Sequence, residues 1–254
     1  MERIYRSVER KPMDTKPLVK NKRAKRVYQK AGIIALKGGF SVTLDGQSLL
    51  TPAGSQLFVK KAEFAVELAA EWNSQGAYIE RASMPLNRIV NTAIDHVAYE
   101  RIGVAKEVAS YANFDLVCYR AIGPSGLIAK QEAAWNPLLD WIEIACGIKP
   151  ATTNDIQTVP QDPKLISYIA ARIKVVDDVT LASFAMATTI AGSVLIALAI
   201  FDSVLELQSA WHAAQIDEDW QIELWGEDTE AALRRANVKR DFKAAVQVMD
   251  FSHS

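Results

Sequence analysis

The sequence predicts an α+β protein with a small N-terminal domain that contains antiparallel strands, followed by an all-helical C-terminal domain. Alternating apolar residues and a turn signal lie near the start, and helical spacing dominates after about residue 100. Half of the 254 residues are apolar, which is enough for a sizeable core. We expect a basic, flexible tail over residues 1–25, an α+β domain over 26–100 and a helical domain over 101–254.

The basic tail stands out from the rest of the chain. The first 30 residues carry 11 lysines and arginines against 3 acids, whereas the remainder carries 18 against 27. A solvated, mobile terminus is the simplest interpretation of such a segment. The alternative is a nucleic-acid-binding module that contacts phosphates through this charge. No aromatic platform or recognition helix accompanies the charge, so we expect no nucleic-acid partner.

The predicted strands come from residues 40–54, FSVTLDGQSLLTPAG. Apolar residues alternate from Phe40 to Leu44, which is the period of a half-buried strand. Asp45 and Gly46 then supply the positive φ angles that a two-residue hairpin turn needs. The sequence therefore predicts a β-hairpin directly after the tail region.

Helical patterns follow the hairpin. Residues 60–76 have apolar residues at helical spacing, and Pro85 suits the first turn of another helix. Pro137 either starts a new helix or kinks one, because proline cannot donate the helical hydrogen bond. Further helices are expected over residues 163–176, 205–226 and 229–249.

The segment from residue 179 to 201 contains 23 residues without a charge, so its length would allow a membrane span. Asp178 and Asp202 bound it, however, and five serines and threonines interrupt its apolar character. A helix-start signal follows Gly192. We predict two buried helices that meet near Gly192, and no membrane insertion.

Motifs for known chemistry are missing from the sequence. Dinucleotide-binding, P-loop, zinc-protease and serine-hydrolase patterns are absent, so we expect no enzyme activity, no metal and no cofactor. Cys118 and Cys146 are too few for a disulfide framework, which favours a reducing compartment. No signal-peptide pattern is present. The cytoplasm of a bacterium, or the mitochondrial matrix of a eukaryote, is the expected location.

Two tryptophans and seven acids lie close together between Ile216 and Ala231. If residues 206–225 form one helix, Glu218 lies at the centre of an otherwise apolar stripe. Gly226 then provides a left-handed stop. The stripe consists of Leu207, Trp211, Ala214, Glu218, Ile222 and Trp225.

A carboxylate in an apolar stripe needs a partner, because an unpaired buried charge is costly. No lysine or arginine occurs between Lys174 and Arg234. Buried acids are usually satisfied within their own chain, so we favour an internal ion pair with Arg120 or Arg88. The alternative is a docking face that meets a cation on another molecule, with tryptophans as anchors. A third possibility is an enzyme that uses Glu218 as a general acid or base with Arg120 in a closed pocket.

Seven blocks of the sequence together resemble the assembly chaperones of F-type ATP synthase that act on the alpha subunit of the catalytic sector. Their order and spacing match that family over about residues 26–245. The blocks are VTLDGQSLLTPAG, AAEWNSQ, MPLNRIVNTAIDH, FDLVCYRA, QEAAWNPLLDW, GSVLIALAI and IDEDWQIELWGED.

The resemblance implies a two-domain chaperone of bacterial type, without catalytic activity or cofactor, that binds the unassembled alpha subunit until the alpha/beta hexamer forms. One family pattern falls on Glu218, Gln221, Trp225 and the glycine that follows, and another on Arg120 with the two residues before it. Together with Trp211, these side chains are the candidate partner-binding or domain-organising residues. We expect the protein to act as a monomer.

Overall fold

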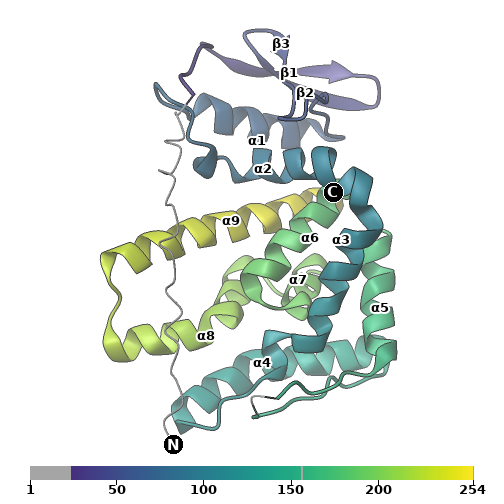
Figure 1. Cartoon of the computed structure of the whole chain (residues 1–254), viewed down its shortest axis with the longest axis vertical. Coiled ribbons are helices and arrows are strands. Elements are labelled where there is room, and N and C mark those ends of the chain that lie inside the picture. Colours follow the sequence, from purple (N-terminus) through teal and green to yellow (C-terminus); the bar gives the residue numbers. More distant parts are fainter. Residues whose placement is uncertain (1–23, 156, 254) are drawn as a thin grey trace, which may run out of the picture.

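The computed structural model describes residues 24–155 and 157–253 of the chain. Three antiparallel strands come first and helices make up most of the rest, which confirms the predicted α+β class (Figure 1). Residues 1–23 of the predicted tail lie outside the described residues. The adjoining residues 24 and 25 are already paired, because Lys25 forms an antiparallel bridge with Tyr78. The predicted domain boundary near residue 100 stays a prediction.

The sheet is a meander with the order β1-β2-β3. The turn between β2 and β3 is the predicted one, since Asp45 and Gly46 both have positive φ. β1 was not indicated by the sequence pattern. The strands are β1 (Ala31–Leu36), β2 (Gly39–Leu44) and β3 (Gln47–Ser48).

Helices α1 and α2 cover one face of the sheet and link it to the rest of the molecule (Figure 1). α1 spans Ala62–Asn73 and buries Phe64 and Leu68 at the expected helical spacing. α2 spans Pro85–Thr92 and begins at the predicted proline. The Trp72 Nε1 donates a hydrogen bond to Asn87 Oδ1 at 2.9 Å, which joins the two helices.

Short helical turns and seven longer helices complete the fold of the described residues. The short ones are η1 (Arg81–Ser83), η2 (Ala93–Val97), η3 (Tyr111–Phe114) and η4 (Leu116–Cys118). The longer ones are α3 (Ala98–Ser110), α4 (Ser125–Cys146), α5 (Pro163–Lys174), α6 (Asp178–Ala191), α7 (Val194–Phe201), α8 (Leu207–Trp225) and α9 (Thr229–His253), of which α3 is bent at Glu100.

Pro137 does not start a new helix, because α4 continues through it as a helix of 22 residues. Both Pro137 and Ala133, whose carbonyl loses its helical donor, lie at the exposed surface. Water can therefore solvate the freed carbonyl group, so the helix continues through the proline.

The uncharged segment forms the two buried helices that were predicted, α6 and α7. Gly192 adopts the left-handed conformation between them, and the Ser193 side chain accepts a hydrogen bond from the Ile196 N–H at the start of α7. Within residues 24–155 and 157–253, no helix has both the length and the apolar character needed to cross a membrane. The segment is thus core, and α9 packs along α6.

A buried carboxylate, Asp115, connects this core to the segment that precedes α4. Its Oδ1 accepts a hydrogen bond from the Val117 N–H at 3.2 Å, and its Oδ2 accepts one from the Leu195 N–H at 3.0 Å. Burial raises the pKa of Asp115 from 3.8 to about 6, although hydrogen bonds from Ser193 and backbone groups oppose this shift. The folded protein therefore binds a proton here more tightly than the unfolded chain does.

The Asp115 carboxyl predicts a specific pH dependence of stability. Between about pH 4 and pH 6 the folded state holds more protons than the unfolded state, so this group's contribution falls as pH rises through that window. With about two pKa units of difference, the free energy of unfolding should fall by about 3 kcal/mol relative to Asp115→Asn, which does not titrate. Urea unfolding of both proteins from pH 4 to pH 7 measures the difference. Parallel pH profiles would contradict the assignment.

Candidate partner-binding surface

The packing of α8 against α4 has the indole ring of Trp135 at its centre. Trp135 is fully buried, and its Nε1 donates a hydrogen bond to the Ala213 carbonyl at 2.8 Å. The Arg120 guanidinium lies over the ring at 5.2 Å from its centroid, a distance at which cation–π attraction is effective. Trp135 therefore positions both the α8 backbone and Arg120.

Gln131 of α4, one turn before Trp135, links Arg120 to the acids of α8. Its carbonyl accepts a hydrogen bond from Arg120 Nη1 at 3.3 Å, and its Oε1 accepts one from the Ala121 N–H at 2.8 Å. Its Nε2 donates to Asp217 Oδ1 at 2.7 Å. The buried amide thus uses both ends of its side chain, and the acid that it reaches is Asp217.

Arg120 forms no ion pair within the described residues, although the carboxylate of Glu132 acts on it electrostatically. Its Nε and Nη2 are shielded from solvent and have no hydrogen-bond partner. Burial of the side chain lowers the pKa of Arg120 below its usual value. A polar cavity of about 310 Å³ lies beside it, but Glu218 is not among the lining residues. The closed pocket with Glu218 and Arg120 that an acid–base enzyme would need is therefore not the arrangement in the structure.

The expectation of an internal ion pair for Glu218 is wrong. In the described part of the chain, Glu218 forms no ion pair or hydrogen bond, and Arg88 pairs instead with Asp241 at 2.6 Å. The acids that do have partners are the ones around it. Asp217 bonds to Gln131, Asp219 pairs with Arg235 and approaches His212 at 3.5 Å, and Glu223 pairs with Lys130 at 2.6 Å.

The predicted stripe explains this difference, because it is not the buried face of α8. The buried residues of the helix are Ala210, Trp211, Ala213 and Ile216. Glu218 lies at the border of this face and is half-buried, so water solvates its carboxylate and no internal cation is required. Gly226 ends the helix with a positive φ of 79°, but its ψ of 171° is extended, and a left-handed turn was expected.

Trp220 of α8 is half-buried and packs against α4. A Cβ atom on Gly126 would lie 2.9 Å from the Trp220 ring, so only glycine allows this close approach. Lys130 lies 5.3 Å from the ring centroid on its way to Glu223. Gly126, Gln131 and Trp135 were not among the predicted site residues, although they contact α8 and so help to determine which face of it is turned outward.

The outward end of α8 and the start of α9 form a hairpin with exposed apolar side chains. Trp225 is 80% exposed, Leu233 64% and Leu224 55%. Gln221 is also exposed, one turn from Trp225. Figure 1 shows this hairpin at the left edge of the molecule, away from the sheet and from α5. Exposed apolar clusters with a polar rim are typical of protein-interaction sites.

Trp211, by contrast, belongs to the core. It is only 5% exposed and packs against Phe242 of α9 with ring centroids 5.7 Å apart. Arg235 and Lys239 lie over its ring. Of the five predicted site residues, Glu218, Gln221 and Trp225 are accessible on one hairpin, whereas Trp211 and Arg120 support it from within.

Two kinds of reactive group bear on catalysis by the described residues: nucleophilic thiols and clusters of metal-binding side chains. Burial raises the pKa of the Cys118 thiol to about 12, so it is protonated at neutral pH. The part of the chain that the structure describes holds no group of three or more metal-binding side chains. An exposed hairpin that is both apolar and acidic is typical of the class of proteins that bind other proteins.

Comparisons with known proteins identify the family. The family model described as ATP12 chaperone protein matches residues 25–143. A candidate chaperone from Agrobacterium tumefaciens has 35% sequence identity and a TM-score of 0.85, over 91% of this chain and 86% of that one. Atp12 from Paracoccus denitrificans has 30% identity and a TM-score of 0.81, over 90% of this chain and 98% of that one. The chain belongs to the ATP12 chaperone family, which confirms the resemblance of the ordered sequence blocks.

Two tryptophans of the same helix test the division between core and surface. Trp211→Ala should lower the free energy of unfolding by about 3–5 kcal/mol, because it empties a buried aromatic site. Trp225→Ala should change it by less than about 0.5 kcal/mol, because the ring is already in water. Chemical denaturation of both variants gives the two values. Similar losses for both would contradict the exposed position of Trp225.

Proposed function

We propose that this protein is a chaperone of ATP synthase assembly that binds the unassembled alpha subunit and prevents its aggregation until the alpha/beta hexamer forms. The observation that carries the proposal is the exposed hairpin of α8 and α9, with Leu224, Trp225 and Leu233 beside an unpaired Glu218. Membership of the ATP12 chaperone family supports it. The protein acts as a monomer, in the cytoplasm of a bacterium or in the mitochondrial matrix of a eukaryote.

The hairpin supplies both parts of a reversible interface. Trp225 is a large anchor that would lose most of its exposed surface on binding, and aromatic side chains of this kind contribute much of the affinity of protein interfaces. Glu218, about two helical turns before Trp225 on α8, offers a carboxylate to a lysine or arginine of the client, which favours correct orientation and fast association. A small interface of this composition suits a chaperone, because the client must leave when its permanent partner arrives.

Other acids of α8 already pair with cations of the neighbouring helices, so these cations do not pair with Glu218. Arg235 on α9 and Lys130 on α4 are engaged by Asp219 and Glu223. Glu218 is half-buried and forms no ion pair with the described residues. Its carboxylate is therefore available to a cation from another molecule.

Capture of the alpha subunit tests the proposal. Tagged chaperone is incubated with unassembled alpha subunit, and beta subunit serves as the specificity control. Wild-type protein should retain alpha and not beta, whereas Glu218→Lys and Trp225→Ala should each reduce capture of alpha at least about tenfold, the effect of losing about 1.4 kcal/mol. Glu107→Lys, an exposed charge reversal on α3, is the matched control and should bind as wild type.

Thermal unfolding of each variant separates binding from folding. Glu218 has no internal partner, so Glu218→Lys should melt close to wild type. A large loss of stability would mean that Glu218 organises the fold. Normal folding with normal capture would remove Glu218 from the site, and equal capture of alpha and beta would contradict the assignment of the client.

A further inference from the structure

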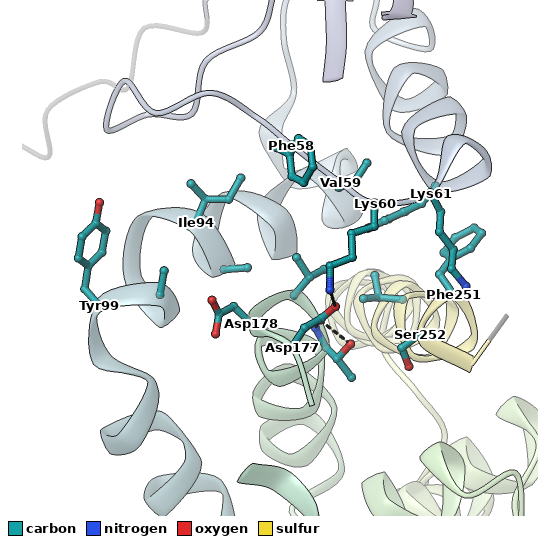
Figure 2. A pocket seen from close by; sticks show the side chains of 16 residues that line it. Phe58, Val59, Lys60, Lys61, Ile94, Tyr99, Asp177, Asp178, Phe251 and Ser252 are labelled. Carbon is teal, nitrogen blue, oxygen red and sulfur yellow. Dashed lines mark hydrogen bonds and ion pairs between the residues drawn. The ribbon is translucent and has the colours of Figure 1, made fainter. Parts of the chain in front are cut away.

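A cavity of about 570 Å³ lies far from the hairpin, where the strand region meets the helices. Phe58 and Val59 line it from the segment that pairs with β2, and Ile94 and Tyr99 line it from η2 and the start of α3. Phe251 closes another side from the last turns of α9, as Figure 2 shows. The walls are mainly apolar, and the volume is typical of a site for a small ligand.

Four charged side chains line the cavity, and three of them are engaged. Lys60 Nζ pairs with Asp177 Oδ2 at 3.4 Å, and Asp177 also accepts hydrogen bonds from Thr180 at the start of α6. Asp178 pairs with Arg101. These contacts leave no free acid in the lining.

Lys61 is the exception. Its Nζ is shielded from solvent and has no hydrogen-bond partner, and in the described part of the chain it forms no ion pair. Figure 2 shows its side chain running from the start of α1 towards Phe251, beside the stacked rings of Phe64 and Phe251. The cavity therefore combines aromatic walls with one uncompensated positive charge.

An unpaired ammonium group away from water is unfavourable unless an anion approaches it. The flexible four-carbon stem of lysine allows the group to turn towards such an anion. The apolar walls favour a hydrocarbon, and the single cation favours one carboxylate.

We propose that this cavity is a binding site for a monocarboxylate with an unbranched hydrocarbon chain. The carboxylate meets Lys61 Nζ, and the hydrocarbon lies against the apolar wall formed by Phe58, Phe64 and Phe251. A small amphipathic ligand is favoured over a protein segment, because the cavity has the volume of a small-molecule site and its one free charge matches one carboxylate. The site is separate from the hairpin, so the proposal does not depend on the identity of the client.

Direct titration of the full chain with decanoate tests the proposal. Isothermal titration calorimetry should show one binding site, and decylammonium, with the same chain and the opposite charge, should bind at least about tenfold more weakly. Lys61→Met should weaken decanoate binding about 10- to 100-fold, the usual effect of losing a hydrogen bond to a charged group. Ala98→Trp, which places a bulky ring at the lining of the cavity, should remove binding.

Lys60→Met provides the matched control, because the neighbouring lysine is already engaged by Asp177 and should leave decanoate binding within about threefold of wild type, a difference below 1 kcal/mol. Thermal unfolding checks that each variant is folded, and Lys61→Met should not be destabilised because its ammonium has no partner to lose. Equal binding of decanoate and decylammonium, or unchanged binding by Lys61→Met, would overturn the proposal. Absence of decanoate binding together with loss of client capture by Ala98→Trp would assign the cavity to a protein segment and also overturn it.

Discussion

The position of the candidate surface depends on the buried carboxylate of Asp115. It holds the first turn of α7 and the turn before α4 through hydrogen bonds from backbone N–H groups. The next residue reinforces this connection, because the Leu116 N–H donates to the Gly192 carbonyl. Since α7 is almost wholly buried, these bonds fix the strand-like segment that carries Arg120 to the most rigid part of the molecule.

From that anchor, a chain of contacts leads to the surface. Arg120 is held by a hydrogen bond from its N–H to the Thr153 carbonyl and by the ring of Trp135. Gln131 then connects the Arg120 segment to Asp217 on α8. Each link uses a buried polar group whose removal would leave another unsatisfied, which makes the network costly to disturb. The orientation of α8 is therefore a consequence of the core, and the hairpin at its end is presented on a rigid support.

The sequence predicts which helices and strands form better than it predicts which of their faces are buried. The Asp45-Gly46 turn and the break at Gly192 carry local signals that only a few backbone conformations satisfy. β1 escaped notice because Ile33 and Ile34 are adjacent and both partly exposed, so no alternation marks the strand. Of the two alternatives for Pro137, a new helix start is excluded because α4 continues through it, and its exposed position, which allows this, is not revealed by periodicity.

The error on α8 has a similar origin. Periodicity places the apolar stripe of this helix through Glu218 and Trp225, whereas the buried face runs through Ala210, Ala213 and Ile216. Contacts with Gly126 and Trp135 of α4 decide which of the two faces is buried. These residues are far from α8 in the sequence and lie next to it only in the folded protein. That Glu218, Gln221 and Trp225 bind a partner stays a prediction, which rests on acids and aromatics in one segment. Their surroundings could be known only from the structure, in which Gln221 and Trp225 are exposed and Glu218 is half-buried.

Helix α9 is the element shared by the two proposed sites. Its first turns carry Leu233 beside the hairpin, and its last turns carry Phe251 in the wall of the cavity. Leu233 and Phe251 are 18 residues apart, about 27 Å along the helix at 1.5 Å per residue, so the two sites are separate. Physical continuity alone does not couple them, because coupling requires two arrangements of the helix that the ligands stabilise differently. Phe242, Ala245 and Met249 are buried in the middle and later turns of α9, and this packing against α6 favours one arrangement. The helix is therefore a fixed support for both sites rather than a connection between them.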